Sequence, residues 1–324
     1  IGNVIAHHFL QDKNNFITSL DNLVYENNEC VLQKKIYENY NFVYGDMFEP
    51  DIIKIHAEAS DVVVLLGGLV GDPITKKYPE LSQLINEKAV KNVIDVCSGI
   101  SLKNFIFIST CSNYGLMENS EYADENSKLN PLSLYAKAKV EAEKYILSLK
   151  GNSKMNPTVL RFATAFGLSP RMRFDLTISE FCRELALGNE LSVYDAHTWR
   201  PYCHVKDFAR LIDIIISSKN QDISFQVFNA GGDINNATKK NIVDKILKKI
   251  PHGVVNYQQH GNDPRNYRVN FNKVKSILGF EPKFSIEDGI NELIDCFDEN
   301  IFDLVSKNKN FYGNYDVKYQ INDN

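Results

Sequence analysis

The sequence predicts a doubly wound parallel α/β sheet followed by a smaller C-terminal lobe, and two observations support this prediction. Over the first half of the 324 residues, short apolar runs alternate with segments of helical periodicity, which is the βαβ pattern. After Phe166 this alternation loosens and helix-like segments dominate. With 44% hydrophobic residues, the chain can bury a full core.

The individual elements follow from apolar runs and their periodicity. Strands are expected at residues 16–20, 42–44, 62–66, 104–109, 159–162 and 226–229. The intervening helices are expected at 4–10, 51–59, 80–97 and 134–149. Helices of the smaller lobe are expected at 174–187, 239–249, 270–278 and 286–297. The predicted domains are 1–166 for the sheet, 167–300 mainly for the lobe, with 200–232 returning to the sheet domain, and 301–324 for a tail.

Composition and charge exclude several classes of function. The formal net charge of −5 is spread over the chain without a long basic tract, so neither nucleic acid nor a membrane surface is expected as a partner. No apolar run approaches the ~18–20 residues of a membrane span. The six cysteines show no C-x-x-C pair and no zinc-site spacing, which predicts reduced thiols in a cytoplasmic protein and no metal site.

A tyrosine and a lysine four residues apart are the strongest catalytic signal. Tyr135 and Lys139 lie on one face of the predicted helix. A free phenol has a pKa of about 10, but a cation about 4 Å away stabilises its phenolate by about 4 kcal/mol at an effective dielectric constant of about 20. The pair therefore predicts an acid/base group for hydride chemistry. Such pairs also arise by chance on surface helices, so the prediction depends on what precedes them.

A cluster of hydroxyl groups precedes the pair. The run 104–108 is rich in β-branched and aromatic residues, and Ser109, Thr110 and Ser112 follow at its carboxyl end. Open α/β sheets bind ligands at that end of their strands. An ordinary strand-to-loop junction is the alternative, but strand, hydroxyl cluster and Tyr-x-x-x-Lys together are far more specific than each alone.

With these motifs the chain resembles the extended short-chain dehydrogenase/reductases, namely the nucleotide-sugar epimerases and dehydratases with a Rossmann-like domain. The resemblance covers residues 1–296, and further segments at 160–173, 199–207 and 263–268 follow in the family's order. It implies an NAD-dependent enzyme acting on a nucleotide sugar. It also implies a homodimer that packs through the helices at 80–97 and 134–149.

The resemblance further implies where the cofactor binds. The carboxylate of Asp21 would accept hydrogen bonds from ribose hydroxyls and repel a 2′-phosphate, which favours NAD over NADP, although Asp21 and Asn22 can also be only a turn. Small residues after the third predicted strand let backbone approach the pyrophosphate. The expected cofactor-binding residues are Gly2, Asp21, Asn22, Asp46, Met47, Leu66, Gly67, Gly68, Asn86, Ser109, Tyr135, Lys139 and Phe162.

The start of the chain departs from the family pattern. Where the family has a strand and a G-x-x-G-x-x-G turn, this chain begins with Ile1, and only the last glycine is matched, by Gly2, 19 residues before Asp21. We expect the central strand and most of the pyrophosphate cradle to be missing. A gap would then separate two parts of the sheet, and NAD would bind poorly.

The expected catalytic residues are Thr110, Tyr135 and Lys139. Tyr135 would take the proton of a sugar hydroxyl, usually at C4, and Thr110 would hydrogen-bond the reacting oxygen, giving a 4-keto intermediate. Family members that are 4,6-dehydratases carry an Asp-Glu pair where this chain has Cys111 and Ser112. A 4-epimerase is therefore favoured. A 4-dehydrogenase or ketoreductase, a 4,6-dehydratase and, from a different class, a non-catalytic NAD-binding regulatory protein are the alternatives.

Substrate binding is expected to depend on arginines. Arg200 and Arg265 stand at family positions that clamp the diphosphate, and Arg171 and Arg173 resemble a motif near the sugar and nucleotide. Thr164 replaces an asparagine of many 4-epimerases. The expected substrate-binding residues are Ser112, Thr164, Arg171, Arg173, Arg200 and Arg265.

Overall fold

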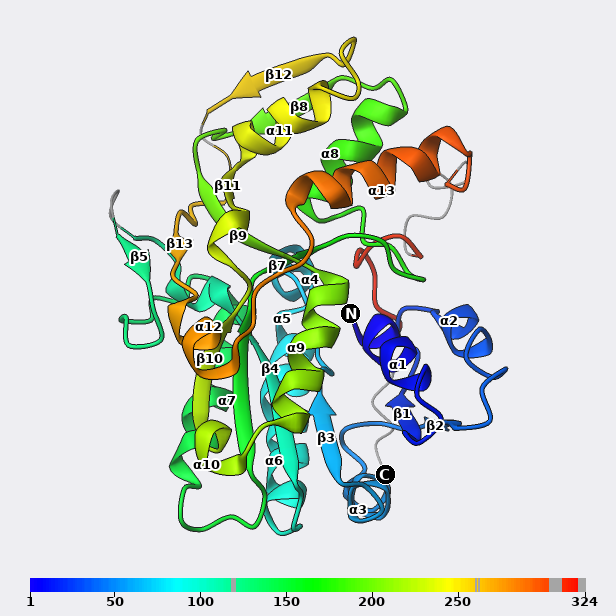
Figure 1. The fold of residues 1–324 in the computed structure, drawn as a ribbon, viewed down its shortest axis with the longest axis vertical. Helices are drawn as coiled ribbons and strands as arrows, with labels where there is room; N and C mark the ends of the chain where they lie inside the picture. The colour runs from blue at the N-terminus through cyan, green and yellow to red at the C-terminus, as the bar shows by residue number, and fades with distance from the viewer. Residues whose placement is uncertain (118–120, 260, 262, 303–310, 320–324) are drawn as a thin grey trace.

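The computed structural model of the chain describes residues 1–117, 121–259, 261, 263–302 and 311–319. It has the predicted α/β fold, with parallel strands at its centre (Figure 1). Four strands lie in the order β10-β6-β4-β3, and two more pair with each other as β1-β2. Their bounds are β1 Ile17–Asp21, β2 Tyr40–Tyr44, β3 Val62–Leu65, β4 Asn104–Thr110, β6 Pro157–Phe162 and β10 Gln226–Ala230.

The sheet β10-β6-β4-β3 and the sheet β1-β2 are separate in the described residues. Within the described ranges, no strand pairing joins the four-stranded and the two-stranded sheet. The strands next to the break between these two sheets are less buried than the strands farther from it. Every residue of β4 and β6 is buried, whereas Val62, Val63 and Val64 of β3 are only half-buried, and so are residues 17–20 of β1. The apolar side chains next to the break therefore lack part of the packing that a neighbouring strand supplies.

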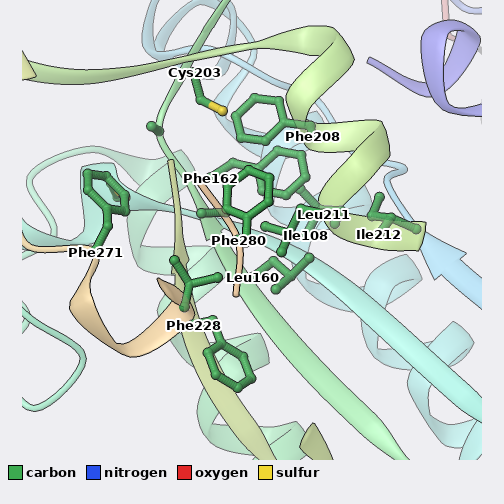
Figure 2. Packing of buried hydrophobic residues seen from close by; sticks show 14 of the residues in the cluster. Ile108, Leu160, Phe162, Cys203, Phe208, Leu211, Ile212, Phe228, Phe271 and Phe280 are labelled. Carbon is green, nitrogen blue, oxygen red and sulfur yellow. The ribbon is translucent and has the colours of Figure 1, made fainter. Parts of the chain in front are cut away.

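Helices cover both faces of the four-stranded sheet. On one face, α3 (Pro50–Glu58), α6 (Val90–Ser98) and α7 (Leu134–Ser148) pack with β3, β4 and β6 in one hydrophobic cluster. On the other face lies a second cluster with α1 (Gly2–Leu10) and α9 (Val205–Ser217), and Figure 2 shows its aromatic centre. The helix α12 (Asn272–Leu278) belongs to this second cluster, against β10, and not to the smaller lobe where the sequence placed it.

The smaller lobe has its own hydrophobic cluster, formed by α8, α11 and α13 (Figure 1). Short strands, which the sequence did not predict, join this lobe to the sheet domain or complete it. The bounds are α8 Thr177–Ala186, α11 Lys239–Leu247, α13 Ile286–Asp298, β7 Thr164–Phe166, β8 Leu191–Tyr194, β9 Trp199–His204, β11 Asn236–Thr238, β12 Val255–Gln258 and, beside the sheet domain, β5 Tyr122–Ala123 and β13 Arg268–Val269.

The helix predicted at 80–97 is three consecutive segments. It consists of α5 (Pro79–Gln83), a π-helical stretch η1 (Leu84–Ala89) and α6. The remaining short helices are α2 Asn28–Leu32, α4 Asp72–Lys77, α10 Asn220–Ile223, η2 Cys111–Tyr114 and η3 Asp233–Asn235. None of the helices in the described residues is long and apolar enough to cross a membrane. The described residues contain no group of three or more His, Cys, Asp or Glu side chains that could hold a metal ion.

A buried ion pair fastens α7 to the sheet. Arg161 of β6 donates to Glu143 of α7 through Nη2 at 2.7 Å and Nε at 3.1 Å, and their side chains are only 6% and 3% exposed. Ser109 and Asn113, at the end of β4, donate to the other carboxylate oxygen, Asn113 at 2.8 Å. Arg161 also donates to Tyr114 Oη at 3.0 Å. Because both ions have several partners, their desolvation is well compensated.

We expect Glu143→Ala to lower the free energy of unfolding by about 3–5 kcal/mol, because it leaves the Arg161 guanidinium buried without its counter-ion. Urea unfolding at pH 7 measures this loss. Glu141→Ala is the matched control, since Glu141 lies on the same helix, is exposed and pairs only with exposed Lys144. The control should lose at most about 1 kcal/mol. Equal losses in the two variants would contradict a structural role for the buried pair.

Candidate active site

The predicted catalytic residues come together at the carboxyl end of β4. Tyr135 is the second residue of α7, whose first turn is capped by Ser133 Oγ, which accepts from Ala136 N at 3.2 Å. Lys139 lies one turn further along, and its Nζ is 5.9 Å from the centre of the Tyr135 ring. Thr110 ends β4. Since α7 packs against β4, Tyr135 and Lys139 lie near the strand that ends at Thr110.

The ammonium group of Lys139 points into the protein. Its Nζ donates to the carbonyl of Ile108 at 2.8 Å and lies 4.6 Å from the centre of the Phe107 ring. The sequence predicts that Lys139 lowers the pKa of Tyr135, but in the structure this pKa is raised. The main cause is desolvation of the phenol, to which the negative charge of Asp72 adds, while Arg173 opposes it. Burial therefore favours the neutral form of the Tyr135 phenol.

The two residues after Thr110 differ sharply in their surroundings. Cys111 is buried, its Sγ lies 3.1 Å from the carbonyl of Arg161, and burial raises the pKa of its thiol. Ser112 is turned the other way, with its Oγ 3.3 Å from both Arg265 Nη1 and Tyr267 Oη. Ser112 therefore borders the site, whereas the Cys111 side chain does not.

The two arginines of the predicted diphosphate clamp share one carboxylate. Arg265 donates to Asp263 through Nε and Nη2, both at 2.8 Å, and Arg200 Nη2 lies 3.0 Å from the same carboxylate. Arg200 is additionally held by the carbonyls of Trp199 and Arg265. Although desolvation raises the pKa of Asp263, the two guanidinium groups hold it well below its usual range. The clamp is thus preformed and charged.

Arg171 and Arg173 lie near each other, since both act on the pKa of Tyr25, but their side chains have different partners. Arg173 makes two hydrogen bonds of 2.6 Å to Asp175. The guanidinium of Arg171 lies 4.9 Å from the centre of the Tyr25 ring, close to the loop that follows β1, and so near the expected cofactor side. Thr164 is half-buried on β7.

The loops after β1 and β2 meet at the expected ribose and adenine positions. Asp21 is exposed, and one of its oxygens accepts from Leu23 N at 2.7 Å. Asn22 Nδ2 donates to Asp46 Oδ2 at 2.8 Å. Tyr319 from the C-terminal segment donates to the same oxygen at 2.9 Å.

The loop after β3 is built from glycines and held by an asparagine. Asn86 accepts from Leu69 N at 2.7 Å and donates to its carbonyl at 2.9 Å. Gly68 has φ 150°, and a Cβ there would lie 2.9 Å from Asn86 Oδ1. A Cβ on Gly67 would meet Met47 Sδ at 2.5 Å. An exposed acceptor at Asp21 and a side-chain-free loop fit a dinucleotide, with its ribose at Asp21 and its phosphates along the glycines.

Three other predicted cofactor-binding residues, Ser109, Phe162 and Leu66, contact other parts of the protein. The hydroxyl of Ser109 is used in the buried Glu143 network. The Phe162 ring stacks on Phe208 in the core, with centroids 3.7 Å apart (Figure 2). Leu66 lies near the start of α1, where a Cβ on Gly2 would be 3.5 Å from Leu66 Cδ1.

The C-terminal segment 311–319, which the sequence assigns to a tail, lies across the cleft without forming a helix or strand. Asn314 accepts from Arg171 Nη1 and Nη2 at 3.1 Å and donates to the carbonyl of Val70 at 2.9 Å. It thereby links the motif before the smaller lobe to the loop after β3. Tyr312 of this segment packs against Phe174 and Phe302 in the hydrophobic cluster of the smaller lobe. The weak periodicity of the segment did not indicate these contacts.

Comparisons with known proteins also indicate a relationship to epimerases and dehydratases. A family model described as "NAD dependent epimerase/dehydratase family" matches residues 1–231. A dTDP-glucose 4,6-dehydratase of Streptomyces niveus is 25% identical over 88% of this chain and 84% of its own length. A probable UDP-glucuronate 4-epimerase of Rhizobium meliloti is 24% identical over 74% of this chain and 75% of its own length.

A solved structure agrees in fold. The UDP-glucuronic acid 4-epimerase from Bacillus cereus, in complex with UDP-glucuronic acid and NAD, superimposes with a TM-score of 0.82. It is 22% identical, and the match covers 93% of this chain and 96% of that one. With its Tyr-x-x-x-Lys helix beside a parallel sheet and the family match over most of its length, the chain belongs to the NAD-dependent epimerase/dehydratase family of enzymes, whose cofactor is NAD.

Proposed function

We propose that the chain is a nucleotide-sugar 4-epimerase that works through a 4-keto intermediate. The observation that carries this proposal is the junction after β4. Thr110 and Ser112 border the site beside Tyr135, while the side chain of Cys111 is buried away from it. The site therefore offers groups for moving one hydroxyl proton but lacks, at these positions, the paired carboxylates that dehydration at C5 and C6 needs.

The chain's own groups divide the work as follows. Tyr135 exchanges a proton with the sugar hydroxyl at C4, and Thr110 Oγ1, which accepts from Ser112 N at 3.1 Å, orients the same oxygen. NAD held at Asp21 and the glycine loop after β3 would supply the hydride acceptor and donor that oxidation and reduction at C4 need. Because Tyr135 is protonated in this structure, its conversion to a base requires added positive charge at Lys139 and the cofactor.

Substrate phosphates would bind between the smaller lobe and the sheet domain. Arg200 and Arg265 present charged donors there from β9 and from the segment before β13. Guanidinium groups bind phosphate oxygens in a fixed planar geometry, which makes them suited to a diphosphate. This arrangement supports a nucleoside diphosphate sugar as the substrate.

We also infer a cytoplasmic homodimer. Five of the six cysteines are buried free thiols and the sixth is a half-buried free thiol, which suits a reducing compartment. The helices expected at the dimer interface present outward side chains, among them Leu134 of α7, which is 43% exposed. Burial of that surface against a second copy would remove apolar area from water.

The decisive experiment is product analysis by NMR after incubation with NAD⁺ and UDP-, GDP-, CDP- and dTDP-sugars. We expect one of them to give its 4-epimer without net NADH. A 4-keto product with stoichiometric NADH would instead indicate a dehydrogenase, and loss of water would indicate a dehydratase. No conversion in the whole panel would favour a non-catalytic NAD-binding protein.

Tyr135→Phe should lower turnover by at least about 10²-fold, because it removes only the oxygen that exchanges the proton. NAD affinity, measured by isothermal titration, should stay within about threefold of wild type. Tyr145→Phe is the control, since Tyr145 lies on the same helix but donates to Asp95 on the surface. Retained activity of Tyr135→Phe would refute the assignment of the catalytic acid.

Burial lowers the pKa of Lys139 to about 8, and Glu143 only partly opposes this effect. The unfolded chain keeps a proton on this lysine up to about pH 10.4. The folded state therefore binds fewer protons between these values, and its stability rises with pH there. Relative to Lys139→Met, the wild type should gain up to about 3 kcal/mol in unfolding free energy from pH 8 to 10.5. Urea unfolding at both pH values measures it, with exposed Lys137→Met as the control. No gain would contradict a desolvated ammonium.

A further inference from the structure

A carboxylate that the sequence did not single out lies beside the catalytic tyrosine. Asp72 is the first residue of α4, directly after Gly71, whose φ is 118°. The helix α4 packs against α7, which carries Tyr135. Because α4 packs against α7, the charge of Asp72 is close enough to Tyr135 to contribute to the raised pKa of this phenol.

Asp72 also contacts the predicted diphosphate clamp. Its Oδ2 lies 2.9 Å from Arg265 Nη1, and the same nitrogen lies 3.3 Å from Ser112 Oγ. The opposite edge of the Arg265 guanidinium is already occupied by Asp263, with two hydrogen bonds of 2.8 Å. Asp72 is therefore placed between the proton-transfer residues on one side and the phosphate-binding residues on the other, which is where the sugar of a nucleotide sugar would lie.

The nearby positive charges are largely neutralised without Asp72. Arg265 has its bidentate partner in Asp263, and Arg173, the other cation that acts on Tyr135, has a bidentate partner in Asp175. Asp72 makes only a single contact to Arg265 and is 30% exposed. When a phosphate takes Arg265 Nη1, the Asp72 carboxylate keeps its charge and loses this partner.

We propose that Asp72 is a specificity-determining residue that makes the enzyme select nucleotide sugars with a neutral hexose over those with a hexuronate. The inference rests on the proposed function and narrows its substrate class. The Asp72 carboxylate can accept hydrogen bonds from the hydroxyl groups of a neutral sugar. It repels the carboxylate of a hexuronate that lies close to it. Selection by such a repulsive element is a common route to specificity. On this point the chain would differ from the UDP-glucuronate 4-epimerases among its relatives.

The test compares wild type with Asp72→Asn on glucose and glucuronate nucleotides. Both are supplied as UDP and as dTDP derivatives with NAD⁺, and kcat/KM is read from product NMR, while Kd comes from isothermal titration. Wild type should prefer the glucose nucleotide by at least about tenfold, since like charges a few ångströms apart repel strongly in a partly buried site. Asp72→Asn should reduce this preference about tenfold, mainly by improving the glucuronate.

Two control variants separate charge from structure. Asp72→Glu keeps the charge and should keep the preference for the neutral sugar. Asp51→Asn removes a carboxylate from the first turn of α3, where it is exposed, and should change neither Kd. Circular dichroism and NAD affinity show that each variant is folded.

The outcomes also separate this inference from the proposed function. Wild type that binds with the expected preference but gives no epimer would refute the epimerase while supporting the role of Asp72. An unchanged preference in Asp72→Asn would overturn the inference and leave the epimerase intact. Loss of turnover on both sugars with unchanged Kd would also overturn it, because Asp72 would then be a catalytic residue. Binding of neither sugar nucleotide would refute both.

Discussion

The position of α7, which carries Tyr135 and Lys139, depends on the buried ion pair between Glu143 and Arg161. Lys139 lies one turn before Glu143 on α7, and Tyr135 lies one turn before Lys139. The ion pair of Glu143 therefore fixes where both side chains lie along the sheet. The other Glu143 oxygen holds Ser109 and Asn113 on either side of Thr110. The Glu143 carboxylate thus holds both α7 and the end of β4. It thereby fixes the positions of Tyr135, Lys139 and Thr110 relative to one another. A hydrophobic contact of the same size would not specify that register, because it lacks directional bonds.

Burial and charge act against each other at the reaction centre. Desolvation raises the pKa of the Tyr135 phenol and lowers the pKa of Lys139 to about 8, so both groups are driven toward their neutral forms. Such a site holds a phenol ready to donate a proton, and it becomes basic only when further positive charge arrives beside it. Coupling the base to the charge of the oxidised cofactor would keep Tyr135 from abstracting protons without a hydride acceptor in place.

Much of the fold could be predicted from the sequence, because a buried parallel strand such as 104–110 reads as a continuous apolar run. The pair Tyr135 and Lys139 was also predictable, since helical spacing alone places them together. Asp72 was not, because a Gly-Asp-Pro turn has many structural uses and its contact with Arg265 spans almost 200 residues. Nor could the sequence show that the Phe162 ring enters the core beside Phe208, because strand periodicity does not say which face each residue presents once both faces are buried (Figure 2).

The site contains several arginines, and their positive charges must be balanced in the folded protein. Arg173 is paired with the carboxylate of Asp175, and Arg200 and Arg265 share the carboxylate of Asp263. Isolated buried cations would repel one another and destabilise the cleft, so the acids are needed before any substrate arrives. They also decide which anions can enter. A diphosphate carries enough charge to compete for the edges of these guanidinium groups, whereas a single carboxylate on the sugar would have to approach Asp72 without that advantage. On the proposed role of Asp72, these counter-ions would also contribute to selectivity.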